Sequence, residues 1–304
     1  MSGKKRKAGS MIGVRRRENR QGWILISPYL LFGAIFFLIP LIWTLYLGVT
    51  NWNLISPQYD FVGIQNFLDA VADPKVHKAF FTTYRFFILF VPFVLAFSML
   101  EALVIYHMPK YKSVFIIGFF LPYLASGVAS SVVVRGLLSY ESAINAWIRS
   151  TFGVNINWLN STTLAPMVIA LIMIWKFSGY YALIIESGLE SIPTDVYEAA
   201  DLDGATGFRR FFKITLPMLY PAFYTVSILA TGVVFHIFTE PYLLTNGGPN
   251  GATTTWILEI YDEAFNKLNT GYGSAIAIVA AIVTFLSIGV VRKILEKWGE
   301  RNAW

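Results

Sequence analysis

The chain has no cysteine and little charge. Without cysteine, disulfides and thiolate metal sites are excluded, and the redox compartment cannot be inferred. The three histidines, His77, His107 and His236, lie far apart without metal-ligand spacing, so no metal site is expected. Only 14% of the 304 residues are charged and 56% are hydrophobic, whereas soluble domains are about 25% charged. This balance indicates an integral membrane protein.

Six apolar runs are long enough to cross a membrane as helices, which requires about 20 residues each. Because lipid offers no hydrogen-bonding partner to the backbone, we expect these runs to be helices and not open sheet. The predicted fold is therefore all-α and polytopic, with six transmembrane helices. The runs cover residues 23–49, 80–106, 113–137, 164–187, 211–239 and 273–295.

The basic residues predict the orientation of these spans. Seventeen of the 24 Lys and Arg residues lie before the first run, in the 107–112 and 188–213 connections, or after the last run, whereas the opposite connections hold four. By the positive-inside rule, both termini are then cytoplasmic. The basic tail precedes a span, so anionic lipid headgroups are its expected neighbours and nucleic acid is not. The first run is too long for a cleaved signal peptide, and we expect it to be retained.

We divide the chain into four parts on this basis. They are a basic cytoplasmic tail (1–22), the first span with its outer loop (23–79), a transmembrane core (80–295) and a cytoplasmic C-terminus (296–304). Near the end of the core, the spacing of apolar residues over 256–264 is typical of a short amphipathic helix. That helix would either lie at the membrane surface or pack between spans.

A polar segment, EAADLDGATGFRRFFKITLP, interrupts the apolar chain at residues 198–217. Pro193 suits the first turn of a short helix, and Glu198 would lie near the positive end of its dipole. Gly204 suits a left-handed C-terminal cap, and Thr206 suits the N-cap of the next helix. Helix chemistry alone leaves two hypotheses: a crosswise helix that a cytoplasmic partner holds, or a solvated connector.

The spacing within this segment resembles the EAA loop of binding-protein-dependent ABC importer permeases. The matching positions are Glu198-Ala199-Ala200, then Gly204 after three residues, Ile214 after nine more, and Leu216-Pro217 after one. The stretches SIPTDVYEAADLDGA, LLTNGGP, YLGVTNWNL and FVGIQNF look like the maltose-type, carbohydrate-importing branch of that family. The resemblance extends from about Trp23 to Arg292.

The resemblance implies a type I ABC importer permease fold in the plasma or inner membrane of a prokaryote. It implies four partners: a second, similar permease subunit, a cytoplasmic ABC ATPase dimer, an extracellular or periplasmic solute-binding protein, and a carbohydrate substrate. The chain lacks a G-x-x-x-x-G-K-[ST] phosphate-binding loop, so it is not expected to be an enzyme. ATP and magnesium would be bound by the separate ATPase.

The resemblance also implies roles in the EAA segment, which we define as residues 191–217. Glu198 would bond the ATPase, and Ala199 and Ala200 would allow close contact. Gly204 would hold the turn, with Asp203 beside it in the coupling surface.

Ionisable groups inside spans are candidates for function. Lys176 lies in the middle of the fourth run beside Trp175, Phe177 and Tyr180, and aromatic faces suit the apolar faces of a sugar. The resemblance places part of the sugar site on this span, at Lys176, Phe177 and Tyr180. The alternative is a packed aromatic cluster with a snorkelling or tyrosine-paired lysine.

The fifth run departs from the maltose-type pattern. Val233, Val234 and Ile237 occupy positions where polar or aromatic contacts are expected, while Thr231 and His236 are polar candidates for the substrate path. A histidine in such a position is more often a hydrogen-bonded core residue than a ligand, and this is the alternative for His236. This departure suggests a different glycan, or one that passes without a tight transmembrane site. Arg135 is a second departure, and would either snorkel or line the entrance.

Two other functional classes compete with the importer. An ion-gradient-driven secondary transporter would carry protons on Lys176, Glu101 and Glu186, but it gives no reason for the EAA spacing. A membrane-embedded enzyme has no paired acids or nucleophile constellation to support it. Within the importer class, a permease for a non-sugar solute stays open, because the EAA motif is shared across the family.

Overall fold

The computed structural model describes residues 21–302, and helices form almost all of the regular structure there. Four helices are long and apolar enough to cross a membrane, and two bent helix pairs bring the candidate spans to six. The predicted all-α polytopic fold is therefore confirmed. Residues 1–20 of the predicted basic tail, and residues 303–304, lie outside the described part of the chain.

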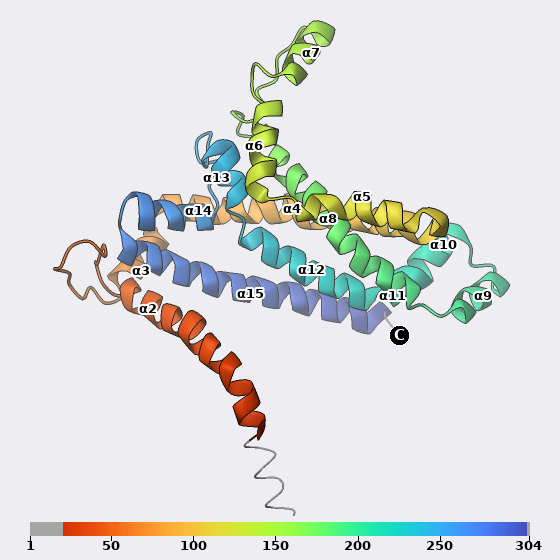
Figure 1. Ribbon diagram of the computed structural model, residues 1–304, viewed down its shortest axis with the longest axis horizontal. Coiled ribbons are helices and arrows are strands. Elements are labelled where there is room, and N and C mark those ends of the chain that lie inside the picture. Colours follow the sequence, from red (N-terminus) through yellow and green to blue (C-terminus); the bar gives the residue numbers. More distant parts are fainter. Residues whose placement is uncertain (1–20, 303–304) are drawn as a thin grey trace, which may run out of the picture.

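The helices keep the labels of Figure 1. The first span runs from Gln21 to Gly48 and contains a π-helical turn, Ala34–Leu38. The first half of the chain contains α2 (Ile39–Gly48), α3 (Gln65–Ala72), α4 (Pro74–His107), α5 (Lys112–Leu124), α6 (Gly127–Leu137) and α7 (Ala143–Phe152). The second half contains α8 (Leu164–Glu190), α9 (Thr194–Leu202), α10 (Gly207–Arg210), α11 (Leu216–Met218), α12 (Tyr220–Phe235), α13 (Thr239–Thr245), α14 (Trp256–Tyr261) and α15 (Thr270–Asn302).

A bundle of α4, α5, α8, α12 and α15 forms the centre of the molecule, and α2 and the α6–α7 arm diverge from it (Figure 1). Phe86 on α4, Ile169 on α8 and Val226 on α12 are completely buried where these helices meet. Lipid is as apolar as these side chains, so close packing holds the helices together. The tightest approach is between α5 and α8, where a Cβ at Gly179 would lie 1.9 Å from the Phe119 carbonyl oxygen.

The second and sixth spans are longer than predicted. α4 begins at Pro74 and not at residue 80, because the Asp73 carboxylate accepts a hydrogen bond from the Lys75 amide (2.8 Å) and proline suits the first helical position. α15 begins at Thr270 and continues to Asn302. The predicted C-terminal part, 296–304, is therefore helical as far as Asn302.

The third span, predicted as one helix over 113–137, is two helices. α5 and α6 meet at an angle of 91°. Pro122 lacks an amide to donate within α5, and Ala125 and Ser126 then adopt extended backbone conformations that end it. Such a break in a membrane span is tolerated where protein or a water-filled cavity surrounds it.

The fifth span, predicted as one helix over 211–239, is also bent. Its two arms, Gly207–Met218 and Tyr220–Phe235, meet at 69°, and regular helix ends at Phe235. Pro217 and Pro221 flank the bend and remove two amides from the hydrogen-bond ladder. The first arm also contains a π-helical turn, Phe211–Thr215, a feature often found at functional sites.

The short amphipathic helix near the end of the core is a packing element. α14 covers Trp256–Tyr261, and a π-helical turn follows it. The Trp256 side chain is 1% exposed, and its indole N–H donates to the Phe235 carbonyl oxygen (2.6 Å). This buried tryptophan supports the alternative in which the helix packs between spans.

Candidate functional site

The polar turn of the EAA segment is fixed by its backbone. Gly204 follows α9 with φ +68°, the left-handed conformation predicted from its sequence position. The Ala205 amide donates to the Ala200 carbonyl oxygen (2.8 Å), and the Gly204 amide donates to the Asp201 carbonyl oxygen (3.1 Å). These two bonds form a Schellman motif, which satisfies the last carbonyls of α9 and turns the chain back.

The outward face of α9 carries most of the predicted coupling residues. Glu198, Ala199, Asp203 and Gly204 are exposed. Ala200 is buried, because the Schellman turn brings Ala205 against it. Of the two alanines, Ala199 alone therefore presents its side chain outward.

The N-caps of α9 and α10 differ in part from the predicted ones. Pro193 is at the N-cap of α9, one residue before the predicted first turn. Thr206 stands at the N-cap of α10, as predicted, but its side chain makes no capping hydrogen bond. Gly207 starts α10 with φ +56°, which displaces the amides that a threonine hydroxyl would otherwise reach.

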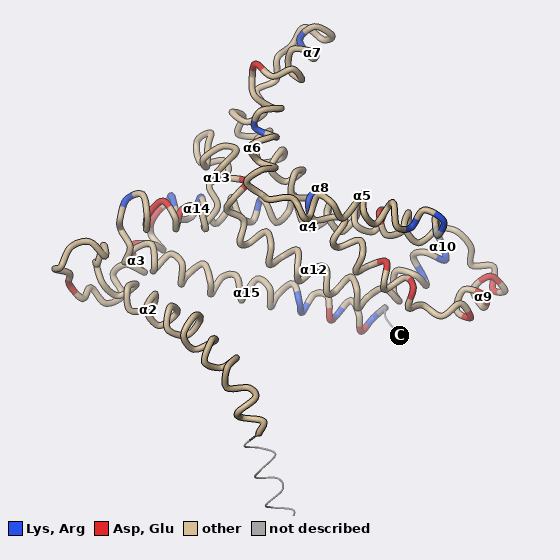
Figure 2. The backbone as a smooth tube through the Cα atoms, in the orientation of Figure 1, with Lys and Arg blue, Asp and Glu red and all other residues tan. Residues whose placement is uncertain are grey.

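Arg210 holds α9 against α10. Its Nη1 donates to Asp201 Oδ1 (2.9 Å), and its guanidinium lies over the Tyr197 ring at 5.5 Å from the centroid. The Thr215 hydroxyl, on the π-helical turn, donates to the Tyr197 hydroxyl (3.4 Å). Figure 2 shows charge gathered at this end of the molecule and sparse along the bundle. Arg210 and Tyr197 therefore connect α9 to the first arm of span five.

Two apolar side chains of this segment are strongly exposed, and motif spacing did not single them out. Leu202 at the end of α9 is 91% exposed, and Phe208 on α10 is 85% exposed. Large apolar residues exposed on a polar segment are typical of an interaction surface. The sequence indicates the exposure of these two side chains only weakly, because the direction of the turn decides which residues face solvent.

A second candidate site lies inside the bundle. Lys176 Nζ on α8 is 3.6 Å from Glu240 Oε1 on α13, and both side chains are about nine-tenths shielded from solvent. The two residues are 64 positions apart, and Gly127 at the break of span three lies beside the pair. The pair therefore links α8 to α13, the helix that follows span five, beside the break of span three. Glu240 was not among the residues predicted for the site.

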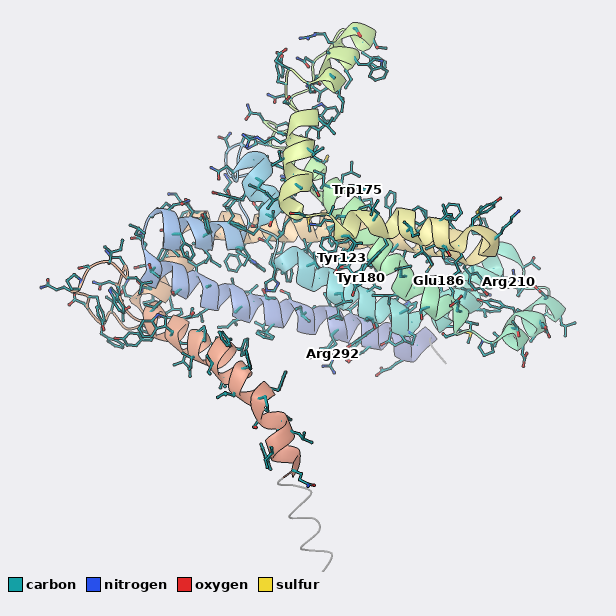
Figure 3. The ribbon with its side chains drawn as sticks, in the orientation of Figure 1. Tyr123, Trp175, Tyr180, Glu186, Arg210 and Arg292 are labelled. Atoms are coloured by element: carbon teal, nitrogen blue, oxygen red, sulfur yellow. The ribbon has the colours of Figure 1, made fainter. Side chains whose placement is uncertain are left out.

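The aromatic residues next to this ion pair form a stack between α5 and α8. Tyr123 and Tyr180 are parallel, with ring centroids 4.5 Å apart and an interplanar angle of 11° (Figure 3). Phe177 meets Tyr123 edge to face at 5.7 Å, and Lys176 Nζ lies 5.8 Å from the Phe177 centroid. The three aromatic side chains are partly buried. Tyr123 was missed, because its contact with Tyr180 depends on how α5 packs.

The other predicted path residues lie outside this cluster. Trp175 is 52% exposed on the outer surface of α8. Thr231 is buried, and its hydroxyl donates to the Ser227 carbonyl oxygen (2.7 Å). His236 bonds the Gly232 carbonyl through Nδ1 (2.8 Å) but is exposed, so the alternative of a core histidine is wrong.

The remaining intramembrane charges have local partners. Ser178 donates to Glu101 Oε1 (2.9 Å), and Lys112 pairs with Glu186 at 2.6 Å. Arg135 is exposed and its Nη1 donates to the Leu243 carbonyl oxygen on α13 (3.3 Å), within a 310 Å³ pocket. Glu101 and Glu186 therefore link helices, and Arg135 ties α6 to α13.

Three carboxylates, Glu259, Asp262 and Glu263, gather after α14 and could hold a cation. Lys267 Nζ lies 2.7 Å from Asp262 Oδ2 and 2.6 Å from Glu263 Oε1. The Lys267 hydrogen bond lowers the pKa of Asp262, whereas burial raises the pKa of Glu259. The Lys267 ammonium group therefore takes the place that a bound cation would have beside these carboxylates.

Comparison with known proteins identifies the family of the chain. Residues 70–301 match the family described as the binding-protein-dependent transport system inner membrane component. The chain belongs to this family. Members of this family are inner-membrane components of transport systems, which confirms the predicted membrane permease. The ion-gradient alternative is not favoured by this membership.

Full-length relatives lie within the same permease family. The chain is 30% identical to the trehalose/maltose transport system permease protein MalF of Thermococcus litoralis, over 92% of this chain and 97% of that protein. It is 31% identical to the probable ABC transporter permease protein YesP of Bacillus subtilis, over 93% of each. It is 29% identical to the sulfoquinovosyl glycerol transport system permease protein SmoG of Agrobacterium fabrum, over 90% of this chain and 89% of that protein.

A solved structure shows the same fold. A chain in the crystal structure of a bacterial alginate ABC transporter, in complex with an alginate pentasaccharide-bound periplasmic protein, matches with a TM-score of 0.81 at 20% identity. The match covers 93% of this permease chain and 97% of the other. The predicted type I ABC importer permease fold is confirmed.

Proposed function

We propose that this chain is a permease subunit of an ATP-driven importer that receives carbohydrate from a solute-binding protein. The observation that carries the proposal is the EAA segment: a short exposed helix, ended by Gly204 and tied through Arg210 and Tyr197 to span five. Such a helix can receive a push from outside and pass it to the spans. The names of the relatives, which include trehalose/maltose and sulfoquinovosyl glycerol permeases, support a sugar or sugar derivative as the solute.

The ATPase would bind to the exposed face of the EAA segment. Glu198 would accept hydrogen bonds from it, and Ala199 would allow close approach. Leu202 and Phe208 supply apolar contact area, because both are strongly exposed. ATP and magnesium would be held by that separate ATPase dimer. Its closure would rock this permease and a second, similar permease between inward-facing and outward-facing states.

The second permease would cover the helices that leave the bundle. Residues Gln21–Gly48 are almost entirely exposed along their length in the isolated chain. The exposed side chains of Trp175 and His236 would lie on the side of the path that the second subunit completes. Thr231 is completely buried and its hydroxyl bonds within α12, so it would support that helix and not contact the substrate.

The sugar would pass the aromatic stack of α5 and α8. Tyr123 and Tyr180 offer flat faces and hydroxyls, and Phe177 adds an apolar edge. The Lys176–Glu240 pair offers a donor and an acceptor to sugar hydroxyls while leaving the path without net charge. This combination of apolar faces and a few placed polar groups is typical of ligand sites.

Reconstitution tests this proposal. The full chain would be placed in proteoliposomes with its partner permease, its ATPase and its solute-binding protein, and ATP hydrolysis and uptake would be measured against a glycan panel. A matched panel of amino acids and peptides tests the non-sugar alternative. We expect uptake only with ATP, the ATPase and a glycan. Uptake by this chain alone, driven by an ion gradient, would refute the proposal.

A further inference from the structure

A large cavity separates the cytoplasmic half of α4 from the EAA segment. Its volume is about 1090 Å³, at the upper end of the about 300–1,000 Å³ typical of ligand pockets. One wall is formed by α4 between Pro92 and His107, and the other by Tyr197 and residues between Gly207 and Leu216. Leucine and phenylalanine make up half of the lining residues. The space is therefore apolar and opens beside the segment that we propose to couple to the ATPase.

The rim of this cavity is basic. Arg210 stands on one wall and His107 on the other. Lys110 and Arg209 are exposed close to them in the sequence, and Figure 2 shows the basic residues near α10 and at the adjoining end of α5. Arg210 directs Nη1 to Asp201, and a guanidinium has further N–H donors that can bond a phosphate at the same time.

We propose that this cavity binds a phospholipid of the cytoplasmic leaflet, with its acyl chains against α4 and its phosphate at Arg210. Basic pockets between membrane helices on the cytoplasmic side recognise anionic headgroups. Arginine binds phosphate oxygens through its planar fork. The apolar wall and the basic rim thus match the two ends of one lipid molecule.

The lining favours acyl chains over another protein helix. Membrane helices approach one another through small residues. In this chain, α5 and α8 approach closely at Gly179, where the absence of a side chain leaves room for the Phe119 carbonyl group. The cavity instead presents large side chains such as Leu95, Leu100 and Phe212, which hold a second backbone away but accommodate flexible chains.

Bound lipid would bridge two parts of the molecule. The π-helical turn Phe211–Thr215 contributes to the wall, and Tyr197 joins that turn to α9. A lipid in the cavity therefore contacts α4 and the EAA segment together, and would hold one against the other. This inference depends on membrane location and not on the identity of the transported solute.

Native mass spectrometry of the full-length protein in mild detergent tests the site. The probes are phosphatidylglycerol and phosphatidylcholine with identical acyl chains. We expect phosphatidylglycerol to be retained at higher collision energy, and Arg210→Gln to reduce its retention about tenfold, as loss of a charged hydrogen bond predicts. Asp201→Asn breaks the same ion pair but keeps the cation, so it should retain the lipid.

A second pair of variants tests the apolar wall without touching charge. Leu100→Trp narrows the cavity and should reduce retention of both lipids, whereas Ile88→Trp, at a site exposed to a similar degree on the same helix but outside the cavity lining, should not. Equal retention of the two lipids in every variant would overturn the proposal. So would an equal loss in Asp201→Asn and Arg210→Gln, or displacement of the lipid by the second permease.

Discussion

Glu198 and Asp203 of the EAA segment are exposed at the edge of the molecule, whereas Lys176 and Glu240 face each other at 3.6 Å with both side chains about nine-tenths shielded. Another protein can contact Glu198 and Asp203. The second pair neutralises itself inside a membrane, where an isolated charge is costly. Under the proposed function this contrast separates two tasks: the exposed region would receive force from the ATPase, and the shielded region would let a solute pass.

The largest expected effect comes from breaking the inner pair. Lys176→Met leaves Glu240 buried without a counter-ion, which costs about 3 kcal/mol or more. We expect lower yield and a lower melting temperature of the purified chain. The double variant Lys176→Met/Glu240→Leu should recover most of that stability without recovering transport. If Lys176→Met is as stable as the wild type, the prediction is contradicted, and the Lys176–Glu240 pair is not isolated from solvent.

Reversing a charge on the outer face should act without unfolding. Glu198→Lys removes a charged contact worth about 1.5–3 kcal/mol, so binding of the ATPase should fall by about tenfold or more. Co-purification of the ATPase measures this, and the melting temperature of the permease should not change. Asp195→Lys, on the same helix but outside the EAA positions, is the matched control. Equal losses in both variants would indicate general electrostatics and not a specific contact.

The turn itself should be the next most sensitive point. A β-branched residue at φ +68° is strained by about 1–2 kcal/mol, so Gly204→Val should displace α9 and weaken coupling about tenfold. Asparagine tolerates this conformation, and Gly204→Asn should keep most of the ATPase stimulation. If both variants couple normally, the left-handed turn is not required.

The smallest effect is expected at the aromatic stack. Tyr180→Ala removes a pair worth about 0.5–1.5 kcal/mol beyond its buried area. We expect a several-fold fall in uptake that differs between glycans, with co-purification of the ATPase unchanged. Tyr180→Phe keeps the stack and tests the hydroxyl alone. A uniform fall for every glycan, together with loss of the ATPase, would move Tyr180 from the path to the scaffold.

The predictability of these two regions also differs. The Gly204 turn depends on one backbone conformation within a few residues, and the sequence predicts it correctly. The Lys176–Glu240 and Tyr123–Tyr180 contacts depend on how separate spans pack, which periodicity does not encode. Pro122 lies within the third span, but a proline can kink a helix by any of several amounts. The 91° bend was therefore not predictable from its position.

The bend of span five has a mechanical consequence. A straight helix pushed at one end slides along its own axis, but an elbow of 69° converts part of that push into torque. The outer arm, α12, has 16 residues, about 24 Å at 1.5 Å per residue. A rotation of about 5° at the elbow would sweep its far tip through about 2 Å, by that same length. The far end of α12 leads into α13 and Glu240. A small displacement of the first arm at the membrane edge would therefore become a sideways movement beside the Lys176–Glu240 pair.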